Sequence, residues 1–181
     1  MTTPSTIDTA LTLRLLTGQP AEMAALQRVL EAAPAYFQTV TGTPPGNAEA
    51  QSTFTALPPD KDYGDKFVWG LYSGPAMIGC ADVIRGYPVR EKAVIGLLLL
   101  AENWEGRGIG RAFAALVESR IASWPEIVRF RIGVVASNAG ALAFWRKLGY
   151  RETGEIKTNP DFVREVIVLE KPVAREPLGV A

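Results

Sequence analysis

The chain has 181 residues and a mass of 19.6 kDa, and its 48% hydrophobic residues are enough to build the core of one domain of ordinary size. Its 19 Lys and Arg residues balance 19 Asp and Glu residues, and this zero net charge argues against a nucleic acid or an anionic membrane as partner. The single cysteine excludes an intramolecular disulfide, and the lack of histidine excludes Ser-His-Asp and Cys-His mechanisms and histidine metal ligands.

The chain begins with "MTTPSTIDTA", which has no basic segment followed by an apolar stretch. We therefore expect no signal peptide. The apolar runs are too short to cross a membrane. These features predict a cytoplasmic protein.

The first third of the chain predicts a strand, two helices and a long irregular segment. Apolar spacing predicts a strand at 11–16 and a helix at 21–33, which Pro34 ends. A short second helix is expected at 36–40. Residues 41–66 are rich in Pro, Gly and Asp, which predicts loops around one short helix. A segment of this length is typical of a functional lid.

The middle of the chain predicts strands followed by a long helix. Residues 66–84 read as a β-hairpin that turns at Ser73-Gly74-Pro75. The continuously apolar run at 92–100 predicts a central strand that is buried on both faces. Apolar residues then recur at three- and four-residue steps between Ile109 and Ile121, which predicts an amphipathic helix.

The last third of the chain predicts two strands around a helix. Residues 127–135 alternate as a strand, with Val128, Phe130, Ile132 and Val134 on one face. A helix is expected at 137–150, with Asn138 as its N-cap. A last strand is expected at 162–170, before a tail with two prolines.

Three glycines stand at alternate positions in "ENWEGRGIGRAF" (102–113), between a predicted strand and a predicted helix. They are Gly106, Gly108 and Gly110. The spacing does not match a Walker loop, and a dinucleotide fingerprint would need a glycine where Arg111 stands. Two interpretations remain: a tight turn that needs the backbone freedom of glycine, or an anion cradle formed with the first helical turn. Arg107 and Arg111 flank the turn and would add positive charge.

A second segment, "SNAGALAFWRKLGYRETGE", favours the anion cradle. The two segments together resemble the GNAT family of acyl-CoA N-acyltransferases. In that family a loop [Q/R]-x-x-G-x-[G/A] holds the coenzyme A pyrophosphate, and its glycines correspond to Gly108 and Gly110. The family motif N-x-x-A-x-x-x-Y-x-x-x-G-[F/Y] corresponds to Asn138, Ala141, Trp145, Gly149 and Tyr150. The resemblance covers residues 67–170 well and the first 66 residues by element order.

The resemblance implies a single α+β domain over residues 1–171, with a mixed, mostly antiparallel sheet flanked by helices and a tail at 172–181. It implies an acetyl-CoA-dependent N-acetyltransferase, with acetyl-CoA bound where 94–100 separates from 128–135. The acceptor would be a primary amine of a small molecule or peptide that attacks directly in a ternary complex. A homodimer is compatible with this fold, and no metal is expected.

The resemblance also assigns residues to the coenzyme. The backbone of Leu98 to Leu100 would pair with the pantetheine arm as an added strand. Backbone amides of Gly106 to Arg111 would hold the pyrophosphate, and Asn138 would contact the coenzyme near the thioester. Asn138 can have this role and cap a helix at the same time. The implied coenzyme-binding residues are Leu98, Leu99, Leu100, Glu105, Gly106, Arg107, Gly108, Ile109, Gly110, Arg111, Asn138, Ala141 and Trp145.

Three positions depart from the family pattern. Glu105 stands where Gln or Arg is usual, so we expect its side chain to point away from the pyrophosphate. Trp145 stands where many members have a Tyr that protonates the leaving thiolate, and Gly133 where some have a glutamate base. At pH 7 a thiol of pKa about 8.5 leaves as thiolate at a cost of about 2 kcal/mol, whereas a lysine-like amine of pKa about 10.4 loses its proton at a cost of about 4.6 kcal/mol. The missing base therefore matters more, and favours a low-pKa amine or a base elsewhere.

Asp82 is the candidate base. It lies in "GCADVI" in phase with Ile78, Cys80 and Ile84, so a carboxylate interrupts an apolar strand face. The alternative is a structural aspartate held by hydrogen bonds or at a strand edge. Cys80 is expected in the core rather than as a nucleophile. The aromatic candidates for the acceptor pocket are Tyr36, Phe37, Tyr63, Trp69 and Tyr87.

Two other functions remain open. One is a non-catalytic acyl-CoA-binding or regulatory module of the same fold, which the residues at 133 and 145 favour. The other is a nucleotide-binding oxidoreductase, which the unmatched dinucleotide fingerprint disfavours.

Overall fold

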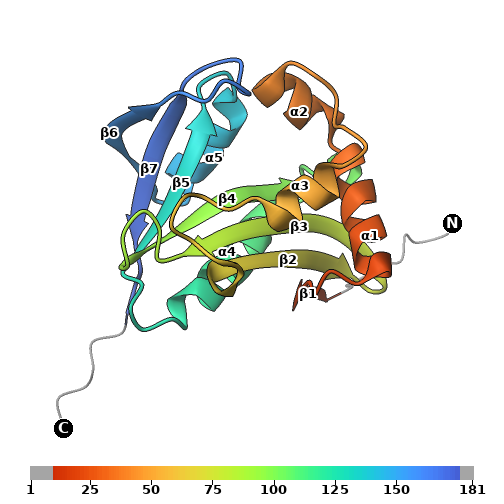
Figure 1. Cartoon of the computed structure of the whole chain (residues 1–181), viewed down its shortest axis with the longest axis horizontal. Coiled ribbons are helices and arrows are strands. Elements are labelled where there is room, and N and C mark those ends of the chain that lie inside the picture. Colours follow the sequence, from red (N-terminus) through yellow and green to blue (C-terminus); the bar gives the residue numbers. More distant parts are fainter. Residues whose placement is uncertain (1–9, 176–181) are drawn as a thin grey trace, which may run out of the picture.

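Residues 10–175, the part of the chain that the computed structural model describes, form one seven-stranded sheet with helices on both faces (Figure 1). The strand order is β1-β2-β3-β4-β5-β7-β6. Within this part, β4 and β5 are the one parallel pair and the other neighbouring strands are antiparallel. The predicted α+β fold with a mixed, mostly antiparallel sheet is confirmed. Apart from Ala10, the segment behind the signal-peptide prediction lies outside the described residues.

The elements follow the predicted order. The strands are β1 (Leu11–Leu15), β2 (Lys66–Ser73), β3 (Ala76–Arg85), β4 (Lys92–Leu100), β5 (Arg129–Val135), β6 (Arg151–Lys157) and β7 (Val166–Pro172). The helices are α1 (Pro20–Glu31), α2 (Pro34–Thr41), α3 (Glu49–Thr55), α4 (Ile109–Ala122) and α5 (Ala139–Lys147), with 3₁₀ turns η1 (Tyr63–Asp65) and η2 (Glu102–Trp104). The irregular segment 41–66 contains the one short α-helix that was expected, α3, and also the turn η1.

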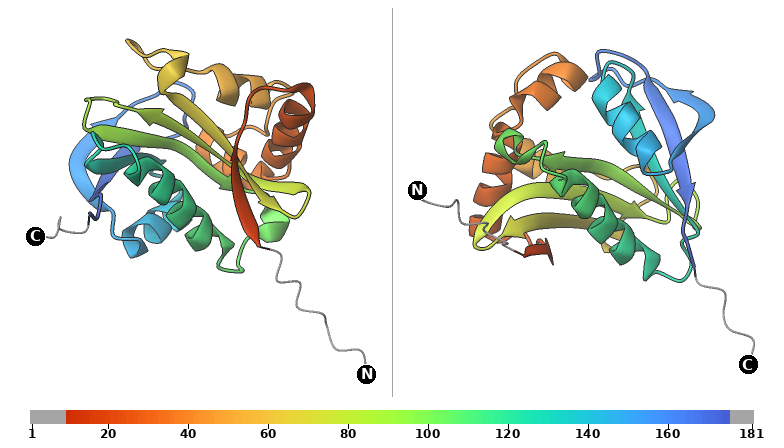
Figure 2. Two further views of the ribbon diagram at one scale, coloured as in Figure 1. Left: turned by 90° about the horizontal axis from the view of Figure 1, so that it is seen from below. Right: turned by 180° about the vertical axis from the view of Figure 1, so that it is seen from behind.

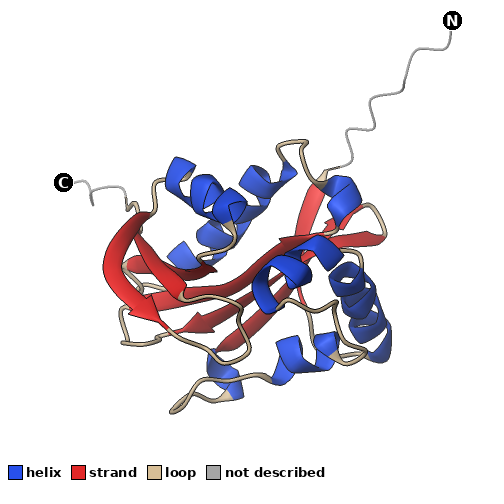
Figure 3. Ribbon diagram, turned by 90° about the horizontal axis from the view of Figure 1, so that it is seen from above, coloured by secondary structure: helices blue, strands red, loops and turns tan. Residues whose placement is uncertain are grey.

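The helices cover the sheet as two layers (Figures 2 and 3). On one face α4 buries Phe113, Val117 and Ile121 completely in a cluster that includes strand residues and part of α5. On the other face α1 buries Leu26 and Leu30 in a second cluster, which also contains residues of β2, β3 and β4. Each helix thus hides one apolar stripe, as its spacing predicts.

β4 and β5 separate along their length. Their pairing runs from Lys92 opposite Arg129 to Ile95 opposite Ile132 and goes no further among the described residues. On its other side β4 carries a bulge, because Asp82 faces Leu97 while the next residue of β3 faces Ile95. A bulge of this kind bends a strand and increases its twist. The predicted opening between these two strands is confirmed, and the exposed Gly96 departs from the prediction of a strand buried on both faces.

The sequence predicts no strand at β6, and the bounds of β5 and β7 differ from those expected. Every residue of β6 is exposed, so its sequence shows no apolar alternation, and pairing with β7 alone makes it a strand. β5 begins at Arg129, and Val128, expected on the same strand face as Phe130, precedes the strand and is 46% exposed. β7 begins at Val166 rather than at residue 162 and extends through Pro172.

Charged side chains of β4, β5, β6 and β7 form one network of ion pairs. Arg131 on β5, which is 5% exposed, donates to Glu170 of β7 at 2.8 Å and to Glu155 of β6 at 2.5 Å. Glu170 also accepts from Lys92 of β4 at 2.6 Å. Burial alone would raise the pKa of Glu170, but the bonds from Lys92 and Arg131 outweigh it and hold that pKa below its ordinary 4.5.

We expect Glu170→Gln to lower the free energy of unfolding by about 3 kcal/mol at pH 7, because Arg131 loses a partner inside the protein. Since the folded pKa of Glu170 is lowered, its stabilisation is present above pH 4.5 and is lost as the pH falls through the folded pKa. The difference between the two proteins should therefore shrink in acid. Urea unfolding at pH 7 and pH 3 measures this.

Glu152→Gln is the matched control. Glu152 pairs with Arg146 on the surface, where both side chains are at least 40% exposed, so its loss should leave the free energy of unfolding almost unchanged. Equal costs for the two variants would show that the network around Arg131 contributes no more than a surface pair.

Candidate active site

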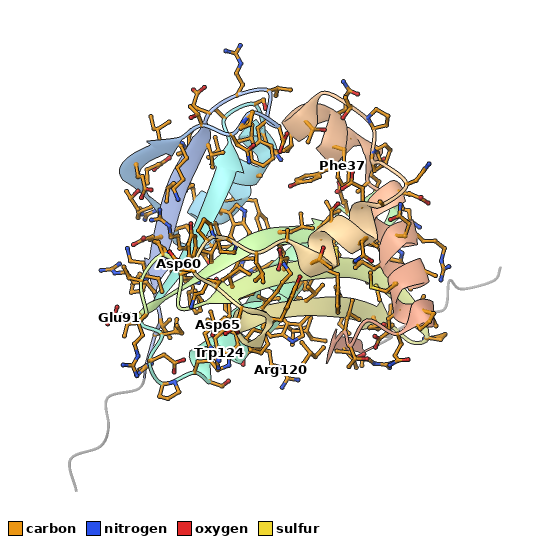
Figure 4. The ribbon with its side chains drawn as sticks, viewed as in Figure 1. Phe37, Asp60, Asp65, Glu91, Arg120 and Trp124 are labelled. Carbon is orange, nitrogen blue, oxygen red and sulfur yellow. The ribbon has the colours of Figure 1, made fainter. Side chains whose placement is uncertain are left out.

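The opening between β4 and β5 continues into a cleft of about 960 Å³. Its floor is formed by residues 94–100 of β4 and 131–135 of β5. Its walls come from α2, the glycine turn, α5 and the segment that links β6 to β7. In Figure 4, Phe37 extends from α2 toward the interior of the molecule. The cleft thus joins elements from both halves of the chain.

The glycine turn needs glycine for its backbone and leaves open space above it. Gly106 has φ of +72° and Gly108 has φ of +76°, a region that other residues rarely adopt. A Cβ on either residue would meet no atom within 4 Å. A Cβ on Gly110 would lie 3.5 Å from the ring of Phe144, an ordinary van der Waals contact, so the structure does not require glycine at this third position.

The turn leads directly into the N-terminus of α4. Gly108 is the N-cap, and no side chain caps this end of the helix. The N–H groups of the first turn of an α-helix have no partner within the helix, and the helix dipole favours an anion beside them. The open space and these N–H groups fit a phosphate, which supports the anion cradle over a merely tight turn.

The backbone of β4 offers a free edge beside the turn. Leu97 to Leu100 pair with β3 on one side, and the other side is not paired with β5. An extended ligand can add to such an edge as a strand. Side chains of Leu99 and Leu100 are buried in the core, so their backbone is the part available to a ligand.

The structure brings most of the predicted coenzyme residues together. All of them line the cleft except Arg107 and Ile109. The guanidinium of Arg107 lies over the Trp104 ring at 5.5 Å, and Ile109 packs against the core. Glu105 borders the cleft and is exposed; the expected direction of its side chain stays a prediction.

The second motif supplies a cap and a wall. Asn138 lines the cleft and also caps α5, since its Oδ1 accepts from the Ala141 N–H at 3.1 Å. Trp145 lines the cleft and is 7% exposed, edge-on to the rings of Phe144 and Tyr150. Tyr150 is fully buried and donates to Glu118 at 2.9 Å, and burial together with that carboxylate raises the pKa of Tyr150. Trp145 and Phe144 thus line the cleft, whereas Tyr150 does not.

Asp82 has features of both a structural residue and a base. Its Oδ1 accepts from the Lys66 ammonium at 2.8 Å, and the Lys66 side chain is 3% exposed. Its Oδ2 lies 3.6 Å from the position that a Cβ on Gly96 would occupy, and Gly96 lines the cleft although Asp82 itself does not. Burial raises the pKa of Asp82 above its ordinary 3.8, against the opposing effect of Lys66. A carboxylate with a raised pKa beside the cleft floor fits general base chemistry.

Cys80 is fully buried, and burial, with a smaller effect of Asp82, raises its thiol pKa to about 12. The thiol is therefore neutral near pH 7, in line with the expected core position.

The aromatic candidates divide between the cleft and other places. Tyr36 and Tyr87 line the cleft. Phe37 and Trp69 are buried, and Tyr63 is 63% exposed, with its hydroxyl bonded to the Thr55 carbonyl. Sequence reasoning missed several lining residues on β5 and around the β6–β7 link, because β6 gave no apolar signal. They include Arg131, Lys157, Thr158, Asn159 and Phe162.

The fold is that of the acyl-CoA N-acyltransferases. The sequence model described as the Acetyltransferase (GNAT) family matches residues 26–150. This match covers more than half of the chain, and the chain belongs to this family.

Solved acetyltransferases have the same fold. One from Thermus thermophilus is 26% identical with a TM-score of 0.68, and the match covers 89% of this chain and 97% of that one. The ribosomal-protein-S18-alanine N-acetyltransferase from Escherichia coli is 16% identical with a TM-score of 0.65, covering 95% and 99%. A GNAT family acetyltransferase from Elizabethkingia anophelis with acetyl-CoA bound is 17% identical with a TM-score of 0.60, covering 91% and 99%. A comparison with curated proteins gave no match.

Neither a membrane-spanning helix nor a metal-binding cluster is found in the described part of the chain. Within residues 10–175, no helix combines the length and the apolar character that crossing a membrane requires. The same residues contain no group of three or more His, Cys, Asp or Glu side chains that could hold a metal ion.

Proposed function

We propose that the protein is an acetyl-CoA-dependent N-acetyltransferase that moves an acetyl group to a primary amine of a small molecule or peptide by direct attack in a ternary complex. The observation that carries the proposal is the cleft, in which the free edge of β4 leads to the uncapped N-terminus of α4. A strand-like pantetheine arm and a pyrophosphate match these two features. The E. anophelis relative, which holds acetyl-CoA in the same fold, supports acetyl-CoA as donor.

In the proposed reaction a neutral amine attacks the thioester carbonyl carbon of acetyl-CoA. The C–N bond forms and the C–S bond breaks, and the coenzyme leaves as a thiolate that water protonates. Before the attack, Asp82 Oδ2, beside Gly96 at the floor of the cleft, takes a proton from the ammonium form of the acceptor, and the second N–H proton is lost to water as the amide forms. Because a lysine-like amine costs about 4.6 kcal/mol to deprotonate at pH 7, removing its proton is the larger task.

Calorimetry with acetyl-CoA, followed by a thiol-release screen, tests this function. The screen covers amino acids, polyamines, aminoglycosides and peptide N-termini. We expect acetyl-CoA to bind and at least one class of amine to release thiol. Binding without release from any amine would support the non-catalytic module, and binding of NAD in place of coenzyme A would support an oxidoreductase.

The remaining parts of the proposal rest on the sequence. We propose one domain over residues 1–171 with a tail at 172–181, although β7 includes Pro172. A cytoplasmic location stays a prediction from the lack of a signal-peptide pattern and of a long apolar run. An acceptor other than a nucleic acid or a membrane stays a prediction from the net charge.

We expect Trp145→Phe to lower the rate of thiol release by about tenfold at most, and Trp145→Tyr to retain activity and coenzyme binding. An indole N–H can donate a hydrogen bond but cannot protonate a thiolate at these pH values. Leaving without an acid costs only about 2 kcal/mol, so the ring serves mainly as a wall of the cleft. Initial rates against pH for the three proteins measure this.

Trp124→Phe is the control, since Trp124 lies at the end of the molecule opposite α2 (Figure 4). A thousandfold loss in Trp145→Phe, with the fold and the acetyl-CoA affinity intact, would show that the indole has a catalytic role.

A further inference from the structure

The side of the cleft formed by α2, β5, the β3–β4 loop and the residues around the β6–β7 link has a distinct lining, which we call the acceptor half. It comprises Tyr36, Val40, Tyr87, Arg131, Lys157 and Phe162. Arg131 pairs across the sheet with Val94, six residues before the end of β4 at Leu100. At about 3.3 Å per residue, this places Arg131 about 20 Å along the strand from the turn. The charged part of the acceptor half, where Arg131 and Lys157 share Glu155, is therefore separate from the pyrophosphate site.

The ionisable side chains that line the acceptor half, apart from its two tyrosines, are cations. Glu105, the one acid among the described residues that line the cleft, lies at the glycine turn. The nearby Asp82 is balanced by Lys66. A polyamine or an aminoglycoside would bring several positive charges into this half without acidic partners there. Such charges would be repelled, and the acceptor is expected to be of another class.

The network around Arg131 leaves one positive charge unbalanced. Its cations are Lys92, Arg131 and Lys157, and its anions are Glu155 and Glu170, so three positive charges face two negative ones. Lys157 is the loosest member, because its Nζ lies 3.6 Å from Glu155, beyond ordinary hydrogen-bond length. Its side chain is 44% exposed, so its ammonium group is accessible to a second anion from the solvent.

We infer that the acceptor carries a carboxylate as well as its amine, and that Lys157, next to Arg131, binds this carboxylate. The inference rests on the proposed function and names its substrate class: amino acids or short peptides with an apolar side chain. The apolar residues Val40 and Phe162 line the same half and would contact that side chain. The amine would lie near Gly96 and Asp82.

Matched pairs of acceptors test the inference. Phenylalanine is compared with phenylalaninamide, and the dipeptide Leu-Leu with its amide, at saturating acetyl-CoA, with spermidine and kanamycin as polycations. We expect kcat/KM to be at least about tenfold higher for each acid than for its amide, because the amide cannot form the charged hydrogen bond that the carboxylate would make with Lys157. The amide also lowers the pKa of the amine, which favours the amide, so a preference for the acid reports recognition.

Lys157→Gln should lower kcat/KM for the acids about tenfold more than for the amides, mainly through KM. Arg151→Gln is the matched control, because Arg151 is an exposed cation on the same strand that does not line the cleft. Equal effects of Lys157→Gln on acid and amide, or higher rates with amides or polycations, would overturn the inference and leave the proposed transferase intact. Absence of turnover with every amine would also overturn it, and acetyl-CoA calorimetry would then show separately whether the coenzyme site stands.

Discussion

Replacing Gly108 by valine should weaken acetyl-CoA binding about a hundredfold or more while the protein still folds. Valine strains a backbone with φ of +76°, and its side chain occupies the open space above the turn. Losing one or two charged hydrogen bonds between phosphate and backbone accounts for the expected size of the effect. Calorimetry with acetyl-CoA, and thermal unfolding of the same samples, measure both parts of this result.

Gly154→Val is the matched control for this experiment. Gly154 has φ of +85°, and a Cβ placed on it would meet no atom within 4 Å, as at Gly108, but it lies on β6 and does not line the cleft. The substitution should carry a similar backbone strain and leave the affinity for acetyl-CoA unchanged. A folded Gly108→Val protein with normal affinity would contradict the anion cradle.

Asp82→Asn should lower the rate of acetyl transfer at neutral pH by about 10²-fold or more, the usual effect of losing a general base. High pH should partly restore the rate, because the amine then loses its proton without help. In the unchanged protein, burial raises the pKa of Asp82 above 3.8. As the pH is lowered, kcat/KM should therefore begin to fall at a higher pH than it would with an ordinary aspartate as base. The asparagine variant should lack the inflection due to Asp82, and its rate should instead rise steadily with pH as the neutral amine becomes more abundant. Initial thiol release against pH measures all three effects.

Stability must be measured alongside, because Lys66 loses its partner in this variant. The Lys66 side chain is 3% exposed, and an unpaired buried charge costs about 3 kcal/mol or more. Asp65→Asn is the control, since Asp65 also accepts from a lysine at 2.8 Å and does not line the cleft. If Asp82→Asn loses stability but keeps its rate per folded molecule, Asp82 is a structural residue.

Local patterns were enough to find the elements that form the coenzyme half of the cleft. The three glycines and the two amphipathic helices that follow are short-range features, and their spacing alone indicates a turn and an apolar stripe. The opening between β4 and β5 was predicted from the family resemblance rather than from spacing. The structure adds its local cause, the bulge at which Asp82 and Val83 face residues 97 and 95.

The acceptor half was much less accessible to sequence reasoning. β6 has only exposed residues, and it is a strand because β7 pairs with it. Without β6, nothing in the order of residues places Lys157 near Arg131, which lies 26 positions earlier in the chain. Of the aromatic candidates, the structure places Tyr36 and Tyr87 at the cleft and leaves Trp69 in the core.

By itself the sequence determined the class of fold, the family and the position of the glycine turn, because these depend on periodicity and on motifs a few residues long. Only the tertiary structure decided which charges meet. Pairing of β5, β6 and β7 brings Arg131, Glu155 and Glu170 together, and the bulge in β4 places Asp82 Oδ2 beside Gly96. The physical reason is that an ion pair or a cleft depends on distance in space, which strand pairing sets, whereas spacing along the chain encodes only local geometry.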